Sequence, residues 1–274
     1  LVTVVDTDVN DPEALTSLVA GHDAVVNLVA ILHGSEQAFQ AVHVDLPKRL
    51  ATACEAAGVR RLVHVSALGA SADGPSLYQR SKAAGESALQ AQTLDLTVLR
   101  PSVIFGAGDR FLNMFARLQT LLPVMPLAGA GTRFQPVWVQ DVAAAVVHAL
   151  VNPSTIGQTV EAVGPDVFTL AELVRLSGQA VGHARPVVGL PNSLAMLQAT
   201  LMSLIPGDPL MSADNVRSLS VDNVASPTDA GVPTLAAWGM QPSSVAAILP
   251  TYLQADGQAG STRQRLVNLR GGLR

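Results

Sequence analysis

The chain has 274 residues, of which 49% are hydrophobic, 4% aromatic and 14% charged, and its formal net charge is −4. That length and composition favour one large α/β domain, with or without a smaller lobe, and exclude a disordered chain. The negative charge gives no electrostatic reason to expect a nucleic acid as a partner. The single cysteine, Cys54, excludes a disulfide framework within the chain, and the histidines show no metal-ligand spacing, so no metal site is predicted.

Strand-like and helix-like segments alternate along the first hundred residues. Four short apolar runs predict strands, in chain order Val2–Val5, Ala24–Ala30, Arg61–Ser66 and Leu96–Arg100. Helices are expected between them, from about Pro12 to Gly21, from about Glu36 to Ala57 and from Tyr78 onward. Apolar strands joined by helical crossovers are typical of a doubly wound parallel sheet. The fold class is therefore predicted to be α/β.

Glycine and proline become frequent after Pro101, and the regular alternation weakens. A helix from about Asp141 to Leu150 is expected to pack back on the sheet, and Gln158–Val163 is a further candidate strand. Thr169 and Glu172 have the spacing of a capping box, which predicts the start of another helix.

These changes divide the chain into three predicted parts: a nucleotide-binding domain over 1–165, a smaller, mainly helical substrate-side lobe over 166–254, and a basic tail over 255–274. The apolar stretch Leu194–Ile205 is either a core helix of the lobe or a wall for a hydrophobic, quinone-like ligand. The tail is either solvated or in weak contact with anionic lipid. No apolar run is long enough to span a bilayer. We therefore expect a cytoplasmic protein, either free or peripheral on the inner membrane.

A Tyr-x-x-x-Lys step, Tyr78 to Lys82, opens the helix that follows the strand Arg61–Ser66. Residues four apart lie on the same face of a helix, so the Lys82 ammonium can lie beside the Tyr78 phenol and favour its anion. The pKa of Tyr78 would then fall below its ordinary value of about 10, which suits a general acid or base near neutral pH. The same lysine could hold the ribose of a nicotinamide nucleotide. The alternative is an exposed aromatic residue and a solvated lysine.

With these residues in place, the chain resembles the short-chain dehydrogenase/reductase superfamily in its extended or atypical branch. The segments that carry the resemblance are Thr7–Val9, Asn27–Ala30, Val65–Ala67, Tyr78 with Lys82, Arg100–Gly106 and Val137–Ala143. Within the superfamily, the chain is most similar to the group that contains the nucleotide-binding accessory subunit of respiratory complex I and its bacterial relatives. The resemblance covers the first 165 residues well and the remainder loosely.

The resemblance implies a Rossmann-type fold, a small C-terminal lobe and a nicotinamide dinucleotide cofactor, NADP or NAD, with NADP slightly favoured. By this resemblance Asp8 accepts a hydrogen bond from the adenine amino group and Val9 offers a backbone contact. The strand end along the ribose and phosphates is formed by Asn27, Leu28, Val29 and Ala30, and the nicotinamide contacts are Pro101, Ser102 and Val103. The alternative for the strand end is plain packing of a buried strand.

The third catalytic residue of the family is a serine or threonine near the end of the strand before the tyrosine helix. Ser66 lies there, but in the common double-serine form the working serine is the second, and that register falls on Ala67. Ser66 either replaces it or only caps the strand. If Ala67 holds the catalytic position, the transition state loses one hydrogen-bond donor, which costs about 100-fold or more in rate.

One element of the family pattern is absent from the given sequence. The family opens with a strand and a glycine-rich turn at a helix N-terminus, and no such turn precedes Leu1. We therefore expect Leu1 to correspond to the third strand of the family sheet and the first βαβ unit to be missing.

Two functions are consistent with this pattern. The first is an NAD(P)-dependent oxidoreductase, epimerase or dehydratase, in which Tyr78, Lys82 and Ser66 assist hydride transfer at a carbonyl or hydroxyl of an unidentified small molecule. The second is a non-catalytic NADP(H)-binding scaffold or redox sensor associated with a respiratory complex.

Overall fold

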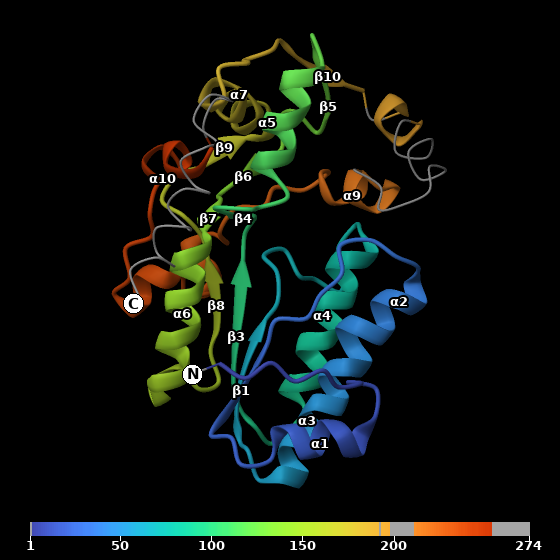
Figure 1. Cartoon of the computed structure of the whole chain (residues 1–274), viewed down its shortest axis with the longest axis vertical. Coiled ribbons are helices and arrows are strands. Elements are labelled where there is room, and N and C mark those ends of the chain that lie inside the picture. The colour runs from blue at the N-terminus through green and yellow to red at the C-terminus, as the bar shows by residue number, and fades with distance from the viewer. Residues whose placement is uncertain (1, 192, 198–210, 254–274) are drawn as a thin grey trace, which may run out of the picture.

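A parallel sheet of four strands, in the order β1-β2-β3-β8, forms the centre of the computed structural model, which describes residues 2–191, 193–197 and 211–253 (Figure 1). The strands are β1 (Ala24–Asn27), β2 (Arg61–Val65), β3 (Asp95–Pro101) and β8 (Thr159–Ala162). All three neighbouring pairs are parallel. Four of the predicted strands therefore lie in one sheet, and the Rossmann-type α/β prediction is confirmed.

Helices cover both faces of this sheet (Figure 1). One face carries α1 (Pro12–Val19), α3 (Leu46–Ala57) and α4 (Leu77–Gln90), and the other carries α6 (Val139–Val151). Because successive residues of a strand point to opposite faces, Leu62 of β2 joins the apolar core under α1 and α3, whereas Val63 joins the core under α6. This two-sided burial explains the continuous apolar character of the predicted strands.

The segment Val2–Val5 is not a strand, which corrects the sequence prediction. Val2 and Val4 are 91% and 89% exposed, and β1 forms an edge of the sheet, paired with β2 alone among the described strands. β-branched residues favour an extended backbone, but a strand forms only where a neighbouring strand pairs with that backbone.

The helix predicted from Glu36 to Ala57 is interrupted by a π-helical turn. It runs as α2 (Glu36–Gln40), the π turn Ala41–Asp45 and α3, and it ends at Gly58, whose φ of 73° is left-handed. π turns widen a helix by one residue and often occur at functional sites. This turn carries His43 toward the helix α4.

The second lobe packs around its own apolar core at the carboxyl end of the sheet. Its elements, several of them only two residues long, are β4 (Ile104–Phe105), α5 (Leu112–Leu121), β5 (Met125–Ala128), β6 (Arg133–Phe134), β7 (Val137–Trp138), β9 (Phe168–Thr169), α7 (Leu170–Ala180), β10 (Val187–Leu190), α9 (Ala213–Ser218) and α10 (Val245–Tyr252). Short 3₁₀ turns lie at Pro153–Thr155, Thr228–Ala230 and Leu235–Trp238. The capping box predicted at Thr169 and Glu172 is present at the start of α7.

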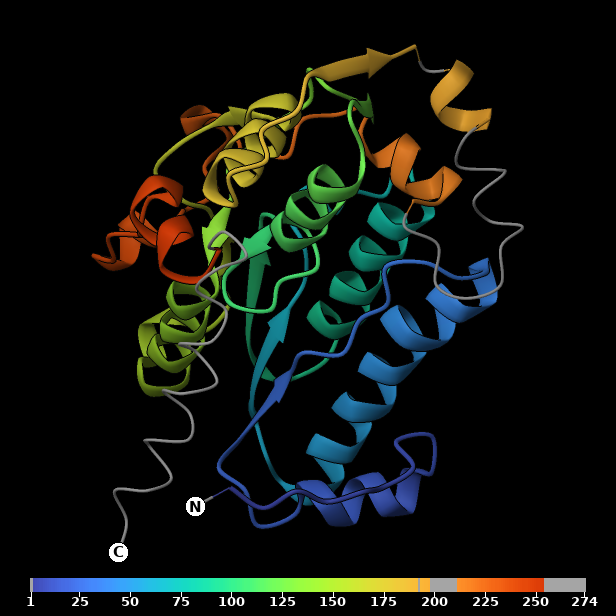
Figure 2. The same ribbon diagram turned by 45° about the horizontal axis from the view of Figure 1, so that its top comes forward.

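Helix α9 lies over the N-terminal end of α4, so the lobe reaches back to the start of the Tyr78 helix (Figure 2). Residues 193–197 are helical, whereas the rest of the predicted Leu194–Ile205 helix and the predicted tail fall outside the described residues. Across the described ranges, no helix has both the length and the apolar character needed to cross a membrane.

Candidate functional site

Tyr78 and Lys82 lie in the first turns of α4, which starts at a capping box formed by Ser76 and Gln79. Lys82 is 1% exposed, and its ammonium donates a hydrogen bond of 3.0 Å to the backbone carbonyl of Val65, at the end of β2. The lysine is therefore not a solvated surface residue. It lies against the strand end that leads into Ser66.

The structure corrects the expected electrostatics of this pair. Burial raises the pKa of Tyr78 to about 12, opposite in direction to the predicted fall. Burial also lowers the pKa of Lys82 to about 8, against the opposing effect of the Glu86 carboxylate. Desolvation is the leading cause of both shifts, and spacing along a helix does not reveal it. Tyr78 is therefore a protonated phenol near neutral pH.

His43 from the π turn contacts the Tyr78 ring edge-on, with ring centroids 5.5 Å apart. Its Nε2 accepts a hydrogen bond from the backbone N–H of Ile31, so its proton is on Nδ1, which donates to the Ser81 hydroxyl at 2.8 Å. Burial and the nearby Lys82 charge lower the pKa of His43 to about 4. A neutral His43 thus connects the segment after β1 to the tyrosine helix, a role that sequence reasoning missed.

A second buried histidine lies at the end of β2. The Asn27 side-chain oxygen accepts from the backbone N–H of Val29, so the Asn27 amide group donates to Nδ1 of His64 at 3.1 Å. Burial and the charge of Lys82 lower the pKa of His64 to about 3, and its Nε2 has no hydrogen-bond partner among the described residues. The predicted cofactor residue Asn27 is therefore turned inward, where it shapes the strand end.

Ser66 is 5% exposed, and its hydroxyl is buried without a hydrogen-bond partner in the described part of the chain. A serine that only capped the strand would use its hydroxyl on the backbone. Ala67 beside it is also buried. The hydroxyl of Ser66 therefore makes no protein hydrogen bond in the described part of the chain, unlike that of a strand cap.

The predicted nicotinamide segment begins where β3 ends at Pro101, as the missing N–H of proline predicts. Ser102 is buried, and its hydroxyl donates to the Asn223 side-chain oxygen at 2.6 Å. Val103 donates its backbone N–H to the same oxygen at 3.3 Å. The lobe therefore reaches this segment through Asn223, a contact across 120 residues that has no local sequence signal.

The predicted adenosine side of the site is open to solvent. Leu28, Val29 and Ala30 follow β1 and are exposed, as are Asp8 and Val9. The Asp8 carboxylate accepts two hydrogen bonds from Asn10, which lower the pKa of Asp8. An ionised, exposed carboxylate and a bare strand end fit the adenine and ribose of a dinucleotide.

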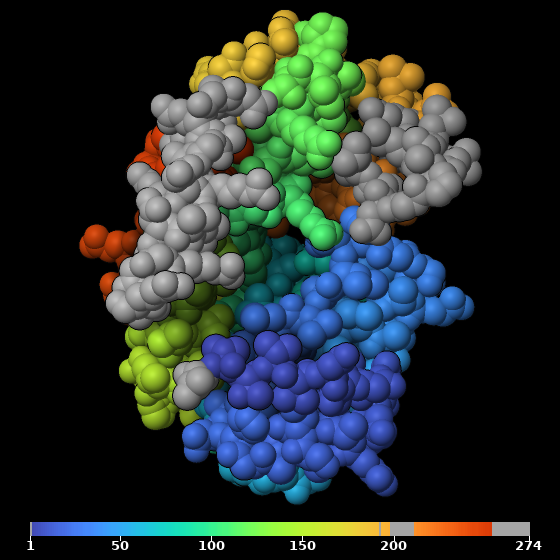
Figure 3. Space-filling view, in the orientation of Figure 1, coloured from blue at the N-terminus to red at the C-terminus, as the bar shows by residue number. Residues whose placement is uncertain are grey.

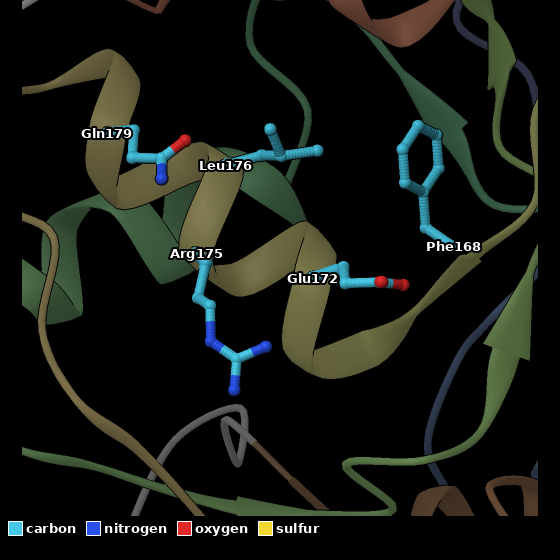
Figure 4. A pocket seen from close by; sticks show the side chains of 5 residues that line it. All are labelled: Phe168, Glu172, Arg175, Leu176 and Gln179. Atoms are coloured by element: carbon cyan, nitrogen blue, oxygen red, sulfur yellow. The ribbon is translucent and has the colours of Figure 1, made fainter.

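The surface is hollowed between the blue segments that follow β1 and the green and orange segments of the second lobe (Figure 3). A separate hollow lies beside α7, lined by Phe168, Glu172, Arg175, Leu176 and Gln179 (Figure 4). No predicted site residue lines this second hollow. The first hollow lies at the carboxyl end of the parallel strands, where open α/β sheets bind ligands.

Gly85 of α4 allows the close approach of the π turn. A Cβ atom at this position would lie 2.0 Å from the backbone carbonyl oxygen of His43, so Gly85→Ala must push the two helices apart. We expect a loss of roughly 2–3 kcal/mol in unfolding free energy, measured by urea denaturation. Gly131→Ala is the control, because nothing lies within 4 Å of its added Cβ. Equal stabilities of the two variants would contradict the close contact.

The parallel sheet and the open strand ends define a Rossmann-type dinucleotide-binding protein. The family model for NAD(P)H-binding proteins matches residues 1–153, and the chain belongs to this family. It is 34% identical over 244 residues to NADH dehydrogenase [ubiquinone] 1 alpha subcomplex subunit 9, mitochondrial, of Mus musculus. The aligned region covers 88% of this chain and 64% of the mouse protein. The predicted resemblance to the complex I group is thereby confirmed.

Two further proteins extend the comparison. A ceramide reductase of Caulobacter vibrioides is 29% identical over 192 residues, which are 70% of this chain and 60% of that protein. A nucleoside-diphosphate-sugar epimerase from Staphylococcus aureus superposes with a TM-score of 0.70 at 16% identity, covering 89% of this chain and 81% of that one, and shares the fold. The chain spans less than two-thirds of the length of the two curated relatives.

Proposed function

We propose that the protein is an NAD(P)H-dependent reductase of a carbonyl group, with Tyr78, Lys82 and Ser66 as its catalytic residues. The observation that carries this proposal is the burial of Lys82 against the end of β2, next to a Ser66 hydroxyl that has no hydrogen-bond partner among the described residues. An unpartnered buried hydroxyl is unfavourable unless a ligand completes it.

The protonation states favour the reducing direction. Tyr78 carries its proton at neutral pH and can donate it to a carbonyl oxygen that becomes an alkoxide. Ser66 donates a hydrogen bond to the same oxygen and orients it. Lys82, with a pKa of about 8, is mostly charged at neutral pH and stabilises the negative charge that develops on the Tyr78 oxygen.

NADPH or NADH, when bound, supplies the hydride. The residues proposed to hold the dinucleotide are Asp8 and Val9 at the adenine, Leu28, Val29 and Ala30 along the ribose and phosphates, and Pro101, Ser102 and Val103 at the nicotinamide. Asn27 contributes indirectly, since its side chain holds the backbone of Val29. The substrate would lie under the second lobe, whose core joins elements from β4 onward with those after residue 166, so we propose a substrate-side lobe that begins before the boundary between 1–165 and 166–254.

Tyr78→Phe tests the assignment. We expect NADPH or NADH affinity by calorimetric titration to change less than about threefold, and reduction of an identified carbonyl substrate to fall by about 100-fold or more. Each of the two coenzymes is titrated separately, and the tighter one fixes the preference, for which we propose NADP. Unchanged turnover in Tyr78→Phe would show that Tyr78 is not a catalytic residue. If neither coenzyme binds, the proposed cofactor site is wrong.

A second candidate function follows from the name of the mouse relative, a subunit of NADH dehydrogenase. In this proposal the protein is an NADP(H)-binding scaffold or redox sensor on a respiratory complex, peripheral to the inner membrane. Tyr78→Phe then leaves both coenzyme binding and assembly unchanged. Comigration with NADH dehydrogenase activity on a native gel, in wild type and in Tyr78→Phe, separates the scaffold from the enzyme.

A further inference from the structure

The side chain of Asn223 connects the ends of two central strands. Its Oδ1 accepts hydrogen bonds from the Ser102 hydroxyl and from the Val103 backbone N–H, which follow β3. Its Nδ2 donates to the backbone carbonyl of Leu68, 3.1 Å away, which follows β2. The N–H of Val103 can only donate and the carbonyl of Leu68 can only accept, so the amide has one consistent orientation.

The backbone of Asn223 is fixed in the second lobe. Its N–H donates to the carbonyl of Arg133 at 2.8 Å, and its carbonyl accepts from the N–H of Gln135 at 3.0 Å, on both sides of Phe134 in β6. The side chain is therefore held at its base by the lobe and at its tip by the sheet. Few degrees of freedom remain for it to lose when a ligand binds.

The same segment of the lobe makes a second set of contacts with the sheet domain, through Asp214. Asp214, at the start of α9, accepts hydrogen bonds from the backbone N–H groups of Leu77 at 2.7 Å and Tyr78 at 3.0 Å. The lobe segment from Asp214 to Asn223 thus contacts both the start of the tyrosine helix and the ends of β2 and β3. The proposed acid Tyr78, the Ser66 hydroxyl proposed to bind the substrate, and the proposed nicotinamide contacts all lie at these places.

We propose that Asn223 is a positioning residue that places the Ser102–Val103 backbone for contact with the nicotinamide half of the coenzyme. This inference rests on the proposed function. Because the Ser102 hydroxyl is bonded to Asn223, Ser102 and Val103 meet the ring through backbone and aliphatic atoms. Loss of the Asn223 amide removes the hydrogen bonds to the Ser102 hydroxyl, the Val103 N–H and the Leu68 carbonyl at once. The adenosine-side residues that follow β1 make no hydrogen bond with Asn223 in the described part of the chain.

Comparison of two ligands isolates the nicotinamide half. NADPH and 2′-phospho-ADP-ribose share the adenosine, the phosphates and the second ribose, but only NADPH carries the nicotinamide; NADH and ADP-ribose form the matching pair. In calorimetric titrations of the full chain, we expect Asn223→Ala to raise the Kd of NADPH about tenfold and the Kd of 2′-phospho-ADP-ribose less than twofold. The ratio of the two affinities, NADPH over 2′-phospho-ADP-ribose, should therefore fall. A general loss of stability would weaken the binding of both ligands alike and leave the ratio of their affinities unchanged.

Two further variants sharpen the test. Asp222→Ala is the matched control: it removes an exposed carboxylate that pairs with Arg133 in the same segment, and we expect its ratio to equal that of wild type. Asn223→Asp keeps the shape and the acceptor oxygen but places a carboxylate against the Leu68 carbonyl, so it should lower the ratio even if Asn223→Ala fails to fold. An unchanged ratio in both Asn223 variants overturns the proposal. A rise in NADPH affinity also overturns it, because Asn223 would then compete with the nicotinamide amide. If wild type binds neither ligand, the proposed function itself fails.

Discussion

Lowering the pH from 7 to 5 should reduce the free energy of unfolding by about 4 kcal/mol through two buried histidines. Unfolded imidazoles have a pKa near 6.5, whereas the folded-state pKa is about 4 for His43 and about 3 for His64. Below pH 6.5 the unfolded chain therefore binds more protons than the folded chain, and stability falls as the pH falls. Each histidine contributes about 2 kcal/mol over this interval, a large share of an ordinary total of about 5–15 kcal/mol.

Urea denaturation of single variants at pH 7 and pH 5 checks this expectation. In His64→Gln and in His43→Gln, the loss of stability between the two pH values should be about half that of wild type. His22→Gln is the control, because His22 is exposed and should leave the wild-type loss unchanged. If the two buried-site variants lose as much stability as wild type, these histidines do not stay neutral in the folded protein.

Removal of the Glu86 carboxylate should have a second large effect. Glu86 is 2% exposed and accepts hydrogen bonds from Nε and Nη2 of Arg100 at 3.0 and 2.6 Å. Glu86→Ala leaves a half-buried Arg100 without its carboxylate partner, so we expect a loss of about 3–5 kcal/mol in unfolding free energy. The same carboxylate raises the pKa of Lys82, so that pKa should fall below 8 in the variant.

An exposed ion pair in the same sheet is the matched control. Arg60 and Asp95 pair at 3.2 Å with side chains 63% and 35% exposed, so Asp95→Ala should cost only about 0–1 kcal/mol. Replacement of Glu86 and Arg100 together by leucine should recover much of the stability lost in Glu86→Ala, because the unpaired charge is removed. A Glu86→Ala variant within about 1 kcal/mol of wild type would show that the buried pair contributes little.

Local patterns in the sequence were sufficient to place the four strands of the central sheet along the chain. The strands 24–27, 61–65 and 95–101 are apolar because both of their faces are covered, and Pro101 ends its strand because it lacks an N–H. The placement of Tyr78 and Lys82 on one helix after β2 also follows from local spacing. Each of these features depends on residues within a few positions of one another, which is why the sequence alone predicts them.

The tertiary structure decided the properties that depend on distant residues. Burial, not the nearby lysine, sets the pKa of Tyr78, and the Lys82 ammonium turns to the Val65 carbonyl. The Val2–Val5 segment is not a strand, because pairing depends on a neighbour in space. His43, Asp214 and Asn223 reach the site across 12 to 155 residues, through the contacts with Ile31, Tyr78 and Leu68. Desolvation and long-range hydrogen bonds arise only when the chain is folded, so the sequence determines the elements of this site and the fold determines their chemistry.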